Sequence, residues 1–292
     1  MADVYRKAEI FREMCLKADT ERDKGLTTPE DVVRFDDIAY GEDKIWQVLD
    51  VYRPKAAKGK LPVIVSVHGG GWVYGSKEIY QYYCMDLARR GFAVVNFTYR
   101  LAPENRFPAS LEDTNSVFAW VKTNAEKYGF DTDNIFAVGD SAGAFCLSAY
   151  ACVLTNRALA ADMAKYFSPA DIVLKGVGLN CGLYTTGGKD ESLEAYLPED
   201  TAGRGEVLRL LDTVSHITPG FPPAYILTAN GDFLVDAPAV LVKALEKNGV
   251  HHRFRVYGDD EHKLFHVFHC DIRSEAAKQA NDDQCAFFKA LM

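Results

Sequence analysis

The sequence lacks the long apolar runs that a membrane-spanning helix needs. No stretch approaches about eighteen uninterrupted apolar residues, and the charged start, residues 1–7, leads into no apolar segment of a secretion signal. Basic residues are also in deficit, with 33 Lys and Arg against 41 Asp and Glu and a net charge of −8. Because nucleic-acid binding favours a basic face, this balance argues against such a partner. We expect a soluble, cytoplasmic protein with no nucleic-acid or membrane partner.

Paired cysteine motifs and metal-ligand motifs are absent too. The seven cysteines are irregularly spaced and form no C-x-x-C, which favours free thiols over a disulfide framework. Cys146 and Cys152 are expected to be small core residues. One group could be interpreted as a metal cluster: His262, His266, His269 and Cys270. No H-E-x-x-H or paired C-x-x-C supports that interpretation, so we expect neither a metal nor an organic cofactor.

What is present is the composition of an ordinary globular protein, over a length of 292 residues that one α/β domain can reach. Strands are predicted at 33–40, 45–52, 61–67, 92–99, 134–138, 172–180, 224–229 and 252–257. The first two should form an antiparallel hairpin. Helices are predicted at 77–90, 109–128, 141–155, 236–248 and 272–290. This alternation predicts an α/β fold with a mostly parallel central sheet of about eight strands and helices on both faces.

Two segments stand outside this alternation. Val4, Ala8, Phe11 and Cys15 recur at helical spacing, which predicts an amphipathic helix over about the first eighteen residues. A further helix start is predicted at Thr28, followed by proline. Residues 181–221 interrupt a strand-to-strand connection, and a long excursion of this kind is typical of a lid. We therefore expect one domain, 1–292, with a small helical cap contributed by about 1–30 and 181–221.

The run GDSAG at residues 139–143 follows an apolar strand and leads into an apolar helical segment. Strand, sharp turn and helix are the context of a nucleophile elbow, G-x-S-x-G. Glycine is needed at both ends, because the turn strains the central residue and neighbouring Cβ atoms would collide. The pattern predicts that Ser141 is a nucleophile, although small residues around a serine also occur in ordinary turns.

A glycine-rich loop, HGGGW at residues 68–72, follows the strand 61–67. Consecutive glycines cost chain entropy and pack no side chains, so they need a reason. Their bare N–H groups can approach a developing oxyanion, and an HGGG motif after a strand is the expected partner of G-x-S-x-G. His68 itself is expected to brace the loop rather than act as a base.

An acid and a base should follow the serine in that chain order. Asp232 and Asp236 both follow the strand 224–229, and Asp232 is favoured because it lies nearer the strand end, whereas Asp236 suits the start of the next helix. The candidate bases follow the strand 252–257: His262, His266 and His269. Other histidines lie at the far end of that strand or in the predicted lid.

Three motifs together resemble the hormone-sensitive-lipase-like group of α/β-hydrolase esterases: HGGGW at 68–72, YRLAPE at 99–104 and GDSAG at 139–143. LDVYRP at 49–54 and FPA at 107–109 are also similar to that group. The resemblance runs from about residue 45 to the end and implies the α/β-hydrolase fold. The first forty residues and 181–221 match only in position, where the family carries its variable cap.

The resemblance also implies roles for single residues. Ser141 would be the nucleophile and Asp232 the acid, although the family's D-P-L is Asp-Phe-Leu here. His266 would be the base, because it keeps the phenylalanine of the family's H-G-F pattern, with valine in place of glycine. His262 is the alternative base, since its separation from Asp232 along the chain is close to the family's. The backbone donors of the oxyanion hole would be Gly70, Gly71 and Ala142.

The expected function is that of a serine carboxylesterase that hydrolyses small, short-acyl esters through an acyl-enzyme intermediate. An acetyl-sugar esterase and an arylformamidase-type amidase would use the same triad. A non-catalytic homologue that binds a small molecule under its lid is the alternative of another class. The expected partner is a small-molecule ester, and the oligomeric state, a homodimer among the options, is left open.

Overall fold

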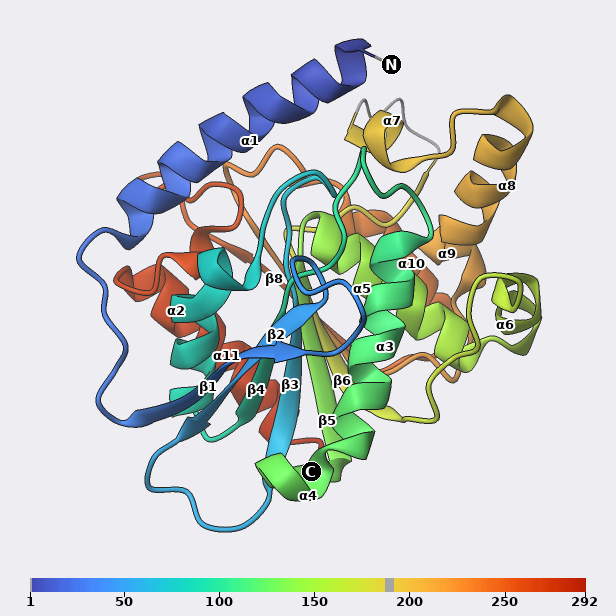
Figure 1. The fold of residues 1–292 in the computed structure, drawn as a ribbon. Coiled ribbons are helices and arrows are strands. Elements are labelled where there is room, and N and C mark those ends of the chain that lie inside the picture. Colours follow the sequence, from blue (N-terminus) through green and yellow to red (C-terminus); the bar gives the residue numbers. More distant parts are fainter. Residues whose placement is uncertain (1, 187–191) are drawn as a thin grey trace.

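The computed structural model describes residues 2–186 and 192–292. The strands form a single sheet in the order β1-β2-β4-β3-β5-β6-β7-β8 (Figure 1). Their bounds are β1 Val32–Ala39, β2 Val48–Pro54, β3 Leu61–Val67, β4 Ala93–Phe97, β5 Phe130–Asp140, β6 Leu174–Asn180, β7 Ala224–Ala229 and β8 His252–Tyr257. β1 and β2 are antiparallel to each other, β2 is antiparallel to β4, and every other pair is parallel. The predicted mostly parallel sheet of eight strands is confirmed.

The main helices fall close to the predicted places, with the differences given below. Their bounds are α1 Ala2–Asp23, α2 Lys77–Arg89, α3 Ala109–Thr123, α4 Ala125–Tyr128, α5 Ala142–Thr155, α6 Arg157–Met163, α7 Ser192–Tyr196, α8 Thr201–Leu211, α9 Thr213–His216, α10 Pro238–Lys247 and α11 Glu275–Lys289. The predicted helix 109–128 is divided at Asn124. α6 was not predicted; its N-cap is Asn156, whose side chain accepts hydrogen bonds from the backbone N–H groups of Ala158 and Leu159.

The helix start predicted at Thr28 is wrong. Residues 26–29 have no regular structure, and β1 begins at Val32. The signal was a capping residue followed by proline, but no apolar stripe follows it that a helix could bury. The chain instead pairs its next residues with β2, where Val32 lies opposite Pro54.

The sheet separates two hydrophobic clusters, because side chains of a strand point alternately to its two faces. In β3, Val63 and Val65 belong to the cluster under α3, α5 and α10, whereas Ile64 belongs to the cluster under α2 and α11. Figure 1 shows these two groups of helices on opposite sides of the sheet. Both faces of the central strands are therefore dry, which explains why their sequences are almost continuously apolar.

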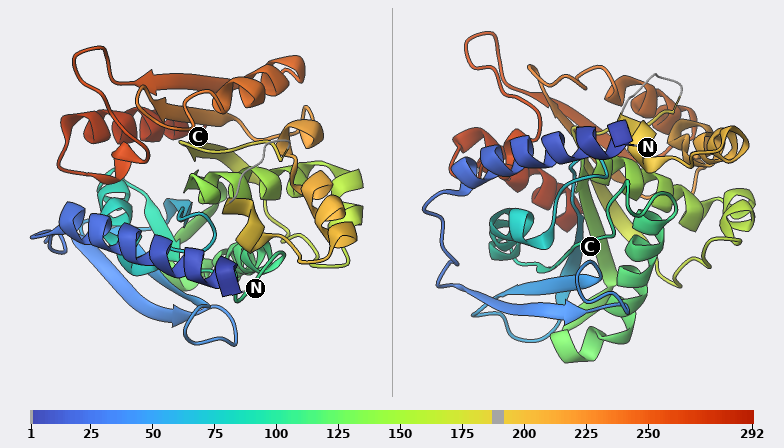
Figure 2. Two further views of the ribbon diagram at one scale, coloured as in Figure 1. Left: turned by 90° about the horizontal axis from the view of Figure 1, so that it is seen from above. Right: turned by 45° about the horizontal axis from the view of Figure 1, so that its top comes forward.

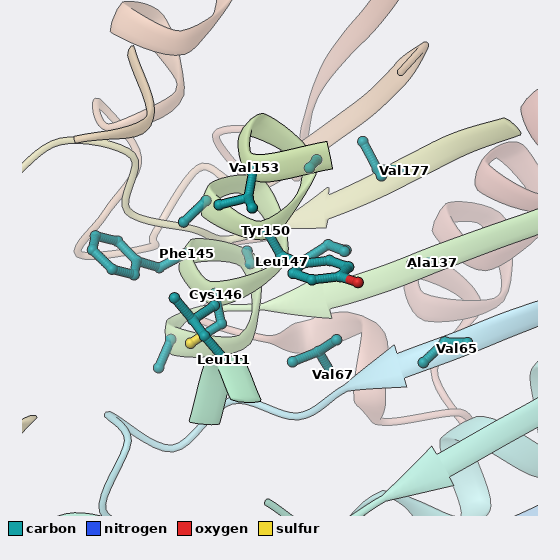
Figure 3. Packing of buried hydrophobic residues seen from close by; sticks show 14 of the residues in the cluster. Val65, Val67, Leu111, Ala137, Phe145, Cys146, Leu147, Tyr150, Val153 and Val177 are labelled. Atoms are coloured by element: carbon teal, nitrogen blue, oxygen red, sulfur yellow. The ribbon is translucent and has the colours of Figure 1, made fainter. Parts of the chain in front are cut away.

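α5 is the most deeply buried helix of this core. Every residue from Ala142 to Val153 is buried, and Figure 3 shows Leu147 and Tyr150 packed between α5 and the strands. Cys146 and Cys152 are fully buried, as predicted, and all seven cysteines are free. Within the described part of the chain, no single helix combines the length and apolar character needed to cross a membrane. α5 and α6 pass that test only as a pair bent by 110°.

The two segments predicted to form a cap lie in different places. α1 crosses the top of the molecule, and its N-terminal end contacts α7 (Figures 1 and 2). α8 contacts α6, and α9 contacts α5 and α10, so both pack at the side of the domain. Residues 187–191 of the predicted cap lie outside the described residues.

Candidate active site

Ser141 occupies a strained turn between β5 and α5. Its backbone has φ 51° and ψ −119°, a left-handed region that L-residues rarely adopt. The Ser141 N–H donates to the carbonyl oxygen of Asn180 at the end of β6, at 2.9 Å. Such strain persists only where the surroundings fix it, and here the neighbouring strand and the buried helix do so.

The two glycines around Ser141 are required by close backbone contacts. A Cβ on Gly139 would lie 2.6 Å from the carbonyl oxygen of Gly143, and a Cβ on Gly143 would lie 2.1 Å from the carbonyl oxygen of Val67. Any side chain at either position would push α5 away from β3 and β5. The glycines predicted from the pentapeptide are therefore explained by sterics.

The glycine loop after β3 presents unpaired backbone donors. Gly70 has φ 108°, and a Cβ there would lie 2.3 Å from the carbonyl oxygen of Tyr74; Gly71 has φ 58°. Within residues 2–186 and 192–292, the N–H groups of Gly70, Gly71 and Ala142 donate to no other group. Ala142 is the first residue of α5, where N–H groups have no partner inside the helix. This arrangement suits an anion at the loop.

His68 is buried beneath this loop. Its ring stacks on Tyr99 with 4.0 Å between centroids, and its Nδ1 donates to the carbonyl oxygen of Gly69 at 2.8 Å. Burial lowers the pKa of His68 to about 4, so the ring is neutral at pH 7. These contacts agree with the bracing role expected from the sequence.

Asp232 and His266 form a pair of a buried acid and a partly exposed base. His266 Nδ1 donates to Asp232 Oδ1 at 2.8 Å, and the Asp232 side chain is fully buried while 21% of the His266 side chain is exposed. Asp232 also accepts from the Leu234 N–H at 2.8 Å and the Thr228 hydroxyl at 3.1 Å. Burial alone raises the pKa of Asp232, but the hydrogen bond and charge of His266 outweigh it and hold the pKa below its ordinary value.

The other candidate bases lie elsewhere. The His262 side chain is 77% exposed and bonds to Asp259, with 3.1 Å from Nδ1 to Oδ1. His269 is buried against Tyr83, and burial lowers its pKa to about 3. The ligand atoms of the suggested metal cluster with Cys270 do not come together at one point. Among the described residues, the only group of three or more with metal-ligand atoms within 4.8 Å of one another is Cys181, Asp232 and His266, and two of its atoms are already joined by a hydrogen bond.

Two departures from the resembled motifs lie beside His266. Val267 has φ 53° and ψ 30°, a left-handed conformation that glycine adopts freely and a β-branched residue does not. The glycine of the family's H-G-F pattern is thus explained, and valine here stores strain next to the base. Phe233 lies with its ring centroid 4.3 Å from that of His266 and is 77% exposed.

Ser141 and His266 share a cavity of about 490 Å³, which we call the serine cavity. Its other lining residues include the glycine loop, the start of α5 and the inner face of α1: Gly70, Gly71, Trp72, Ala142, Phe11, Met14 and Cys15. Asp232 lies behind His266 and does not line it. The volume suits a small organic ligand.

Sequence reasoning missed a buried polar group in this cavity. Asp140, directly before the serine, is 2% exposed. Its burial raises the pKa of the carboxyl group to about 6. Its Oδ2 accepts the hydroxyl of Tyr80 at 2.7 Å, and the Tyr80 oxygen accepts the Gly69 N–H at 3.0 Å. Tyr80 is on α2, so this network joins the elbow to the glycine loop through a helix that no local motif connects to them.

Cys181 was missed as well. It follows the end of β6 directly and is fully buried beside Asp232 and His266. Because β6 and β7 are parallel neighbours, residues that follow them meet at one edge of the sheet. This rule was the available signal for Cys181, whereas nothing in the sequence pointed to Tyr80.

Comparisons with known proteins place the chain in a family. The family model BD-FAE matches residues 49–242. Carboxylesterase NlhH of Mycobacterium tuberculosis is 30% identical over 242 residues, which are 77% of this chain and 74% of NlhH. Esterase LipC of the same species is 39% identical over 121 residues, 41% of this chain but only 30% of LipC, so the chain spans less than a third of that relative.

A solved structure shares the fold over the whole chain. Esterase B from Lactobacillus rhamnosis, inhibited by a C4-C4 tributyrin phosphonate, superimposes with a TM-score of 0.91 at 23% identity, covering 100% of this chain and 96% of that chain. The predicted α/β-hydrolase fold is confirmed by this likeness. The chain therefore belongs to the BD-FAE family and, with relatives such as NlhH, to the hormone-sensitive-lipase-like group of α/β-hydrolase carboxylesterases, which are serine hydrolases.

Proposed function

We propose that this protein is a serine carboxylesterase that hydrolyses small, short-acyl esters with Ser141, Asp232 and His266 as its triad. The observation that carries the proposal is the 2.8 Å hydrogen bond from His266 to Asp232, together with the shared cavity of His266 and Ser141. A buried acid that fixes the ring leaves one histidine nitrogen directed away from it, which is the arrangement a general base needs.

The proposed reaction has two steps. With the proton of His266 on Nδ1, its Nε2 takes the hydroxyl proton of Ser141 as the serine oxygen attacks the ester carbonyl. His266 then returns that proton to the departing alcohol, and an acyl-enzyme remains. A water molecule, activated in the same way, releases the acid and restores Ser141.

The unpaired N–H groups of Gly70, Gly71 and Ala142 are the proposed oxyanion hole. They are fixed by the backbone before substrate arrives, so they need no reorganisation when the carbonyl oxygen becomes negative. Preorganised donors of this kind contribute about 10²–10³ in kcat in other acyl-transfer enzymes.

The walls of the serine cavity support a short acyl chain. Trp72 lines the cavity, is 2% exposed and stacks on Tyr196 with 5.2 Å between centroids, so that wall is closed by a packed core. Phe11 and Met14 cover the cavity from α1. A small substrate fits in the serine cavity without displacing α1.

We extend the proposal to partners and location. The net charge of −8 supports a protein that binds small-molecule esters rather than nucleic acid, and we propose no membrane partner. The seven free thiols support a reducing, cytoplasmic location.

The test compares three alanine variants on p-nitrophenyl butyrate. Ser141→Ala and His266→Ala should each lose at least about 10³-fold in kcat/KM, because each removes a member of the triad. His262→Ala is the matched control and should stay within about twofold of wild type, since its side chain is exposed and outside the cavity.

Circular dichroism and thermal melting should show that all three variants are folded. Loss of activity in His262→Ala with retention in His266→Ala would exchange the base. A wild-type protein that hydrolyses no p-nitrophenyl ester, acetylated sugar or N-formyl aryl amide would contradict the proposal and favour a non-catalytic binding protein.

A further inference from the structure

A second cavity, which we call the side cavity, adjoins the serine cavity. It has a volume of about 450 Å³ and lies between the first turns of α1, the glycine loop and α7. Val4, Ala8, Val73 and Ala195 line it, and so do Phe11 and Gly71, which also line the serine cavity. The two cavities are therefore neighbours that share one side chain and one backbone position.

Phe11 is the shared side chain. Two of its ring carbons lie 3.7 Å from the position that a Cβ on Gly71 would occupy, so the ring faces Gly71 across a gap that a methyl group would fill. The N–H of Gly71 is one of the proposed oxyanion donors. A substrate carbonyl bound there has the ring of Phe11 beside it, and an arm of the ester that extends toward the side cavity meets that ring first.

The ring is held in this place by the anchoring of α1. Next to Phe11, the Arg12 guanidinium donates to the carbonyl oxygens of Val73 at 2.7 Å and Ala102 at 2.9 Å, and it bonds to the carboxylate of Glu104. Further along α1, the Tyr74 hydroxyl donates to Asp19 at 2.8 Å. α1 is thus fixed at two points, Arg12 and Asp19, to residues that include Val73 and Tyr74, which directly follow the glycine loop.

The chemistry of the side cavity suits an apolar chain. Its inner wall consists of Val4, Ala8, Phe11 and Val73. Its charged lining residues are Asp3 and Lys7 of α1, which are largely exposed and paired at 3.2 Å, and Glu194 of α7. An alkyl chain would bury apolar surface against the inner wall.

Resting on the esterase function proposed above, we propose that Phe11 determines substrate specificity by separating the serine cavity from the side cavity. The ring limits the ester to arms that fit the serine cavity. Removal of the ring joins the two cavities and admits a longer alkyl arm.

The experiment measures kcat/KM on two substrate series. In one, p-nitrophenyl esters vary the acyl chain from acetate to decanoate; in the other, acetate esters of linear alcohols vary the alcohol chain from ethyl to decyl. Phe11→Ala should raise the ratio of decanoate to butyrate, or of decyl to butyl acetate, by roughly tenfold. The series that responds identifies which arm enters the side cavity.

Two further variants make the result specific. Val4→Phe fills the side cavity from its far end, and in the Phe11→Ala background it should remove most of the gain on long chains. Ile10→Ala is the control, because Ile10 is the neighbouring residue of α1, is 56% exposed and lines neither cavity. It should leave both chain-length profiles unchanged. Phe11→Leu, which keeps α1 packed, replaces Phe11→Ala if the latter melts early and should give a smaller shift of the same sign.

An active wild-type protein whose two profiles are the same in Phe11→Ala or Phe11→Leu would overturn the role of Phe11 and leave the esterase proposal intact. A wild-type protein without activity on either series would overturn both. Labelling of Ser141 by a fluorophosphonate separates these cases, because it depends on the serine and not on the length of an ester arm.

Discussion

The helix that carries the nucleophile, α5, and the helix that covers the serine cavity, α1, are held in place by different interactions. α5 carries Ser141 at its start and is buried from Ala142 to Val153. α1 covers the same cavity, yet Ile10, Met14 and Leu16 are 56%, 61% and 51% exposed. Polar contacts of Arg12 and Asp19 fix α1 to Val73 and Tyr74 after the glycine loop, and Arg22 bonds to Ile79 of α2.

This difference has an energetic consequence. A buried apolar helix is stabilised by the removal of most of its side-chain surface from water, at about 25 cal/mol per Å². A net hydrogen bond contributes only about 0.5–1.5 kcal/mol. α1 should therefore open locally far more often than α5. We expect a rigidly held nucleophile under a helix that can move to admit substrate.

Gly143→Ala should have the largest effect of these variants, because it disturbs the packing of α5 against β3. The added Cβ would lie 2.1 Å from the carbonyl oxygen of Val67, so α5 must move away from β3. We expect about 1–3 kcal/mol of lost stability from the overpacking, and a loss of roughly 10²-fold in ester hydrolysis because Ser141 is displaced. Urea unfolding and kcat/KM measure the two effects.

A matched control for that variant is Gly205→Ala. Gly205 lies inside α8, and a Cβ there would meet no atom within 4 Å. Alanine should stabilise the helix by about 0.5–1 kcal/mol and leave activity unchanged. Equal behaviour of the two variants would contradict the packing argument.

Asp140, at the buried turn before α5, gives a pH-dependent test of how this region is packed. Burial raises its pKa from the ordinary 3.8 to about 6, so between these values the folded protein holds a proton that the unfolded chain has released. The free energy of unfolding should therefore fall as pH rises from about 4 to 6, by on the order of 3 kcal/mol, and this contribution should be level above that range.

The measurement is urea unfolding at several pH values for wild type and Asp140→Asn. The amide can still accept the Tyr80 hydroxyl but has no proton to lose in this range. The stability of the variant relative to wild type should increase between about pH 4 and 6. A difference that is constant with pH would show that Asp140 ionises freely in the folded protein.

Arg12→Ala tests the attachment of α1 and should have the smallest effect on activity. It removes the contacts to Val73, Ala102 and Glu104, but the Arg12 and Glu104 side chains are 30% and 42% exposed, so we expect a fall in kcat/KM of roughly twofold to fivefold. Lys17→Ala, at an exposed position of the same helix, is the control and should change neither activity nor melting temperature. Equal losses in the two variants would show that Arg12 has no particular role.

Local patterns were sufficient for the sheet and for the elements that carry the motifs. β3, β5 and β7 were found because strands covered on both faces are continuously apolar. The elbow was found because its glycines are required by contacts within a few residues of the serine and with the adjacent strand. The start predicted at Thr28 failed for the converse reason, since a capping residue has meaning only if an apolar stripe follows it.

The choice between His262 and His266 shows where such patterns end. The two residues are four apart and differ little in local sequence, yet one is exposed beside Asp259 and the other bonds to Asp232, which lies on a different loop. Burial and pairing of this kind depend on how two loops pack, which no periodicity encodes.

The sequence by itself determined the eight strands and the main helices between them, the strained serine turn, the glycine loop and the set of candidate acids and bases. Each follows from local sterics or from the period of apolar residues, which act over a few positions of the chain. Only the tertiary structure decided that α1 covers the serine cavity while α8 and α9 pack aside, that Tyr80 joins Asp140 to the glycine loop, and that Phe11 faces Gly71 between the two cavities. These contacts join residues far apart in the chain, and they form because separate elements must bury their apolar faces on one sheet.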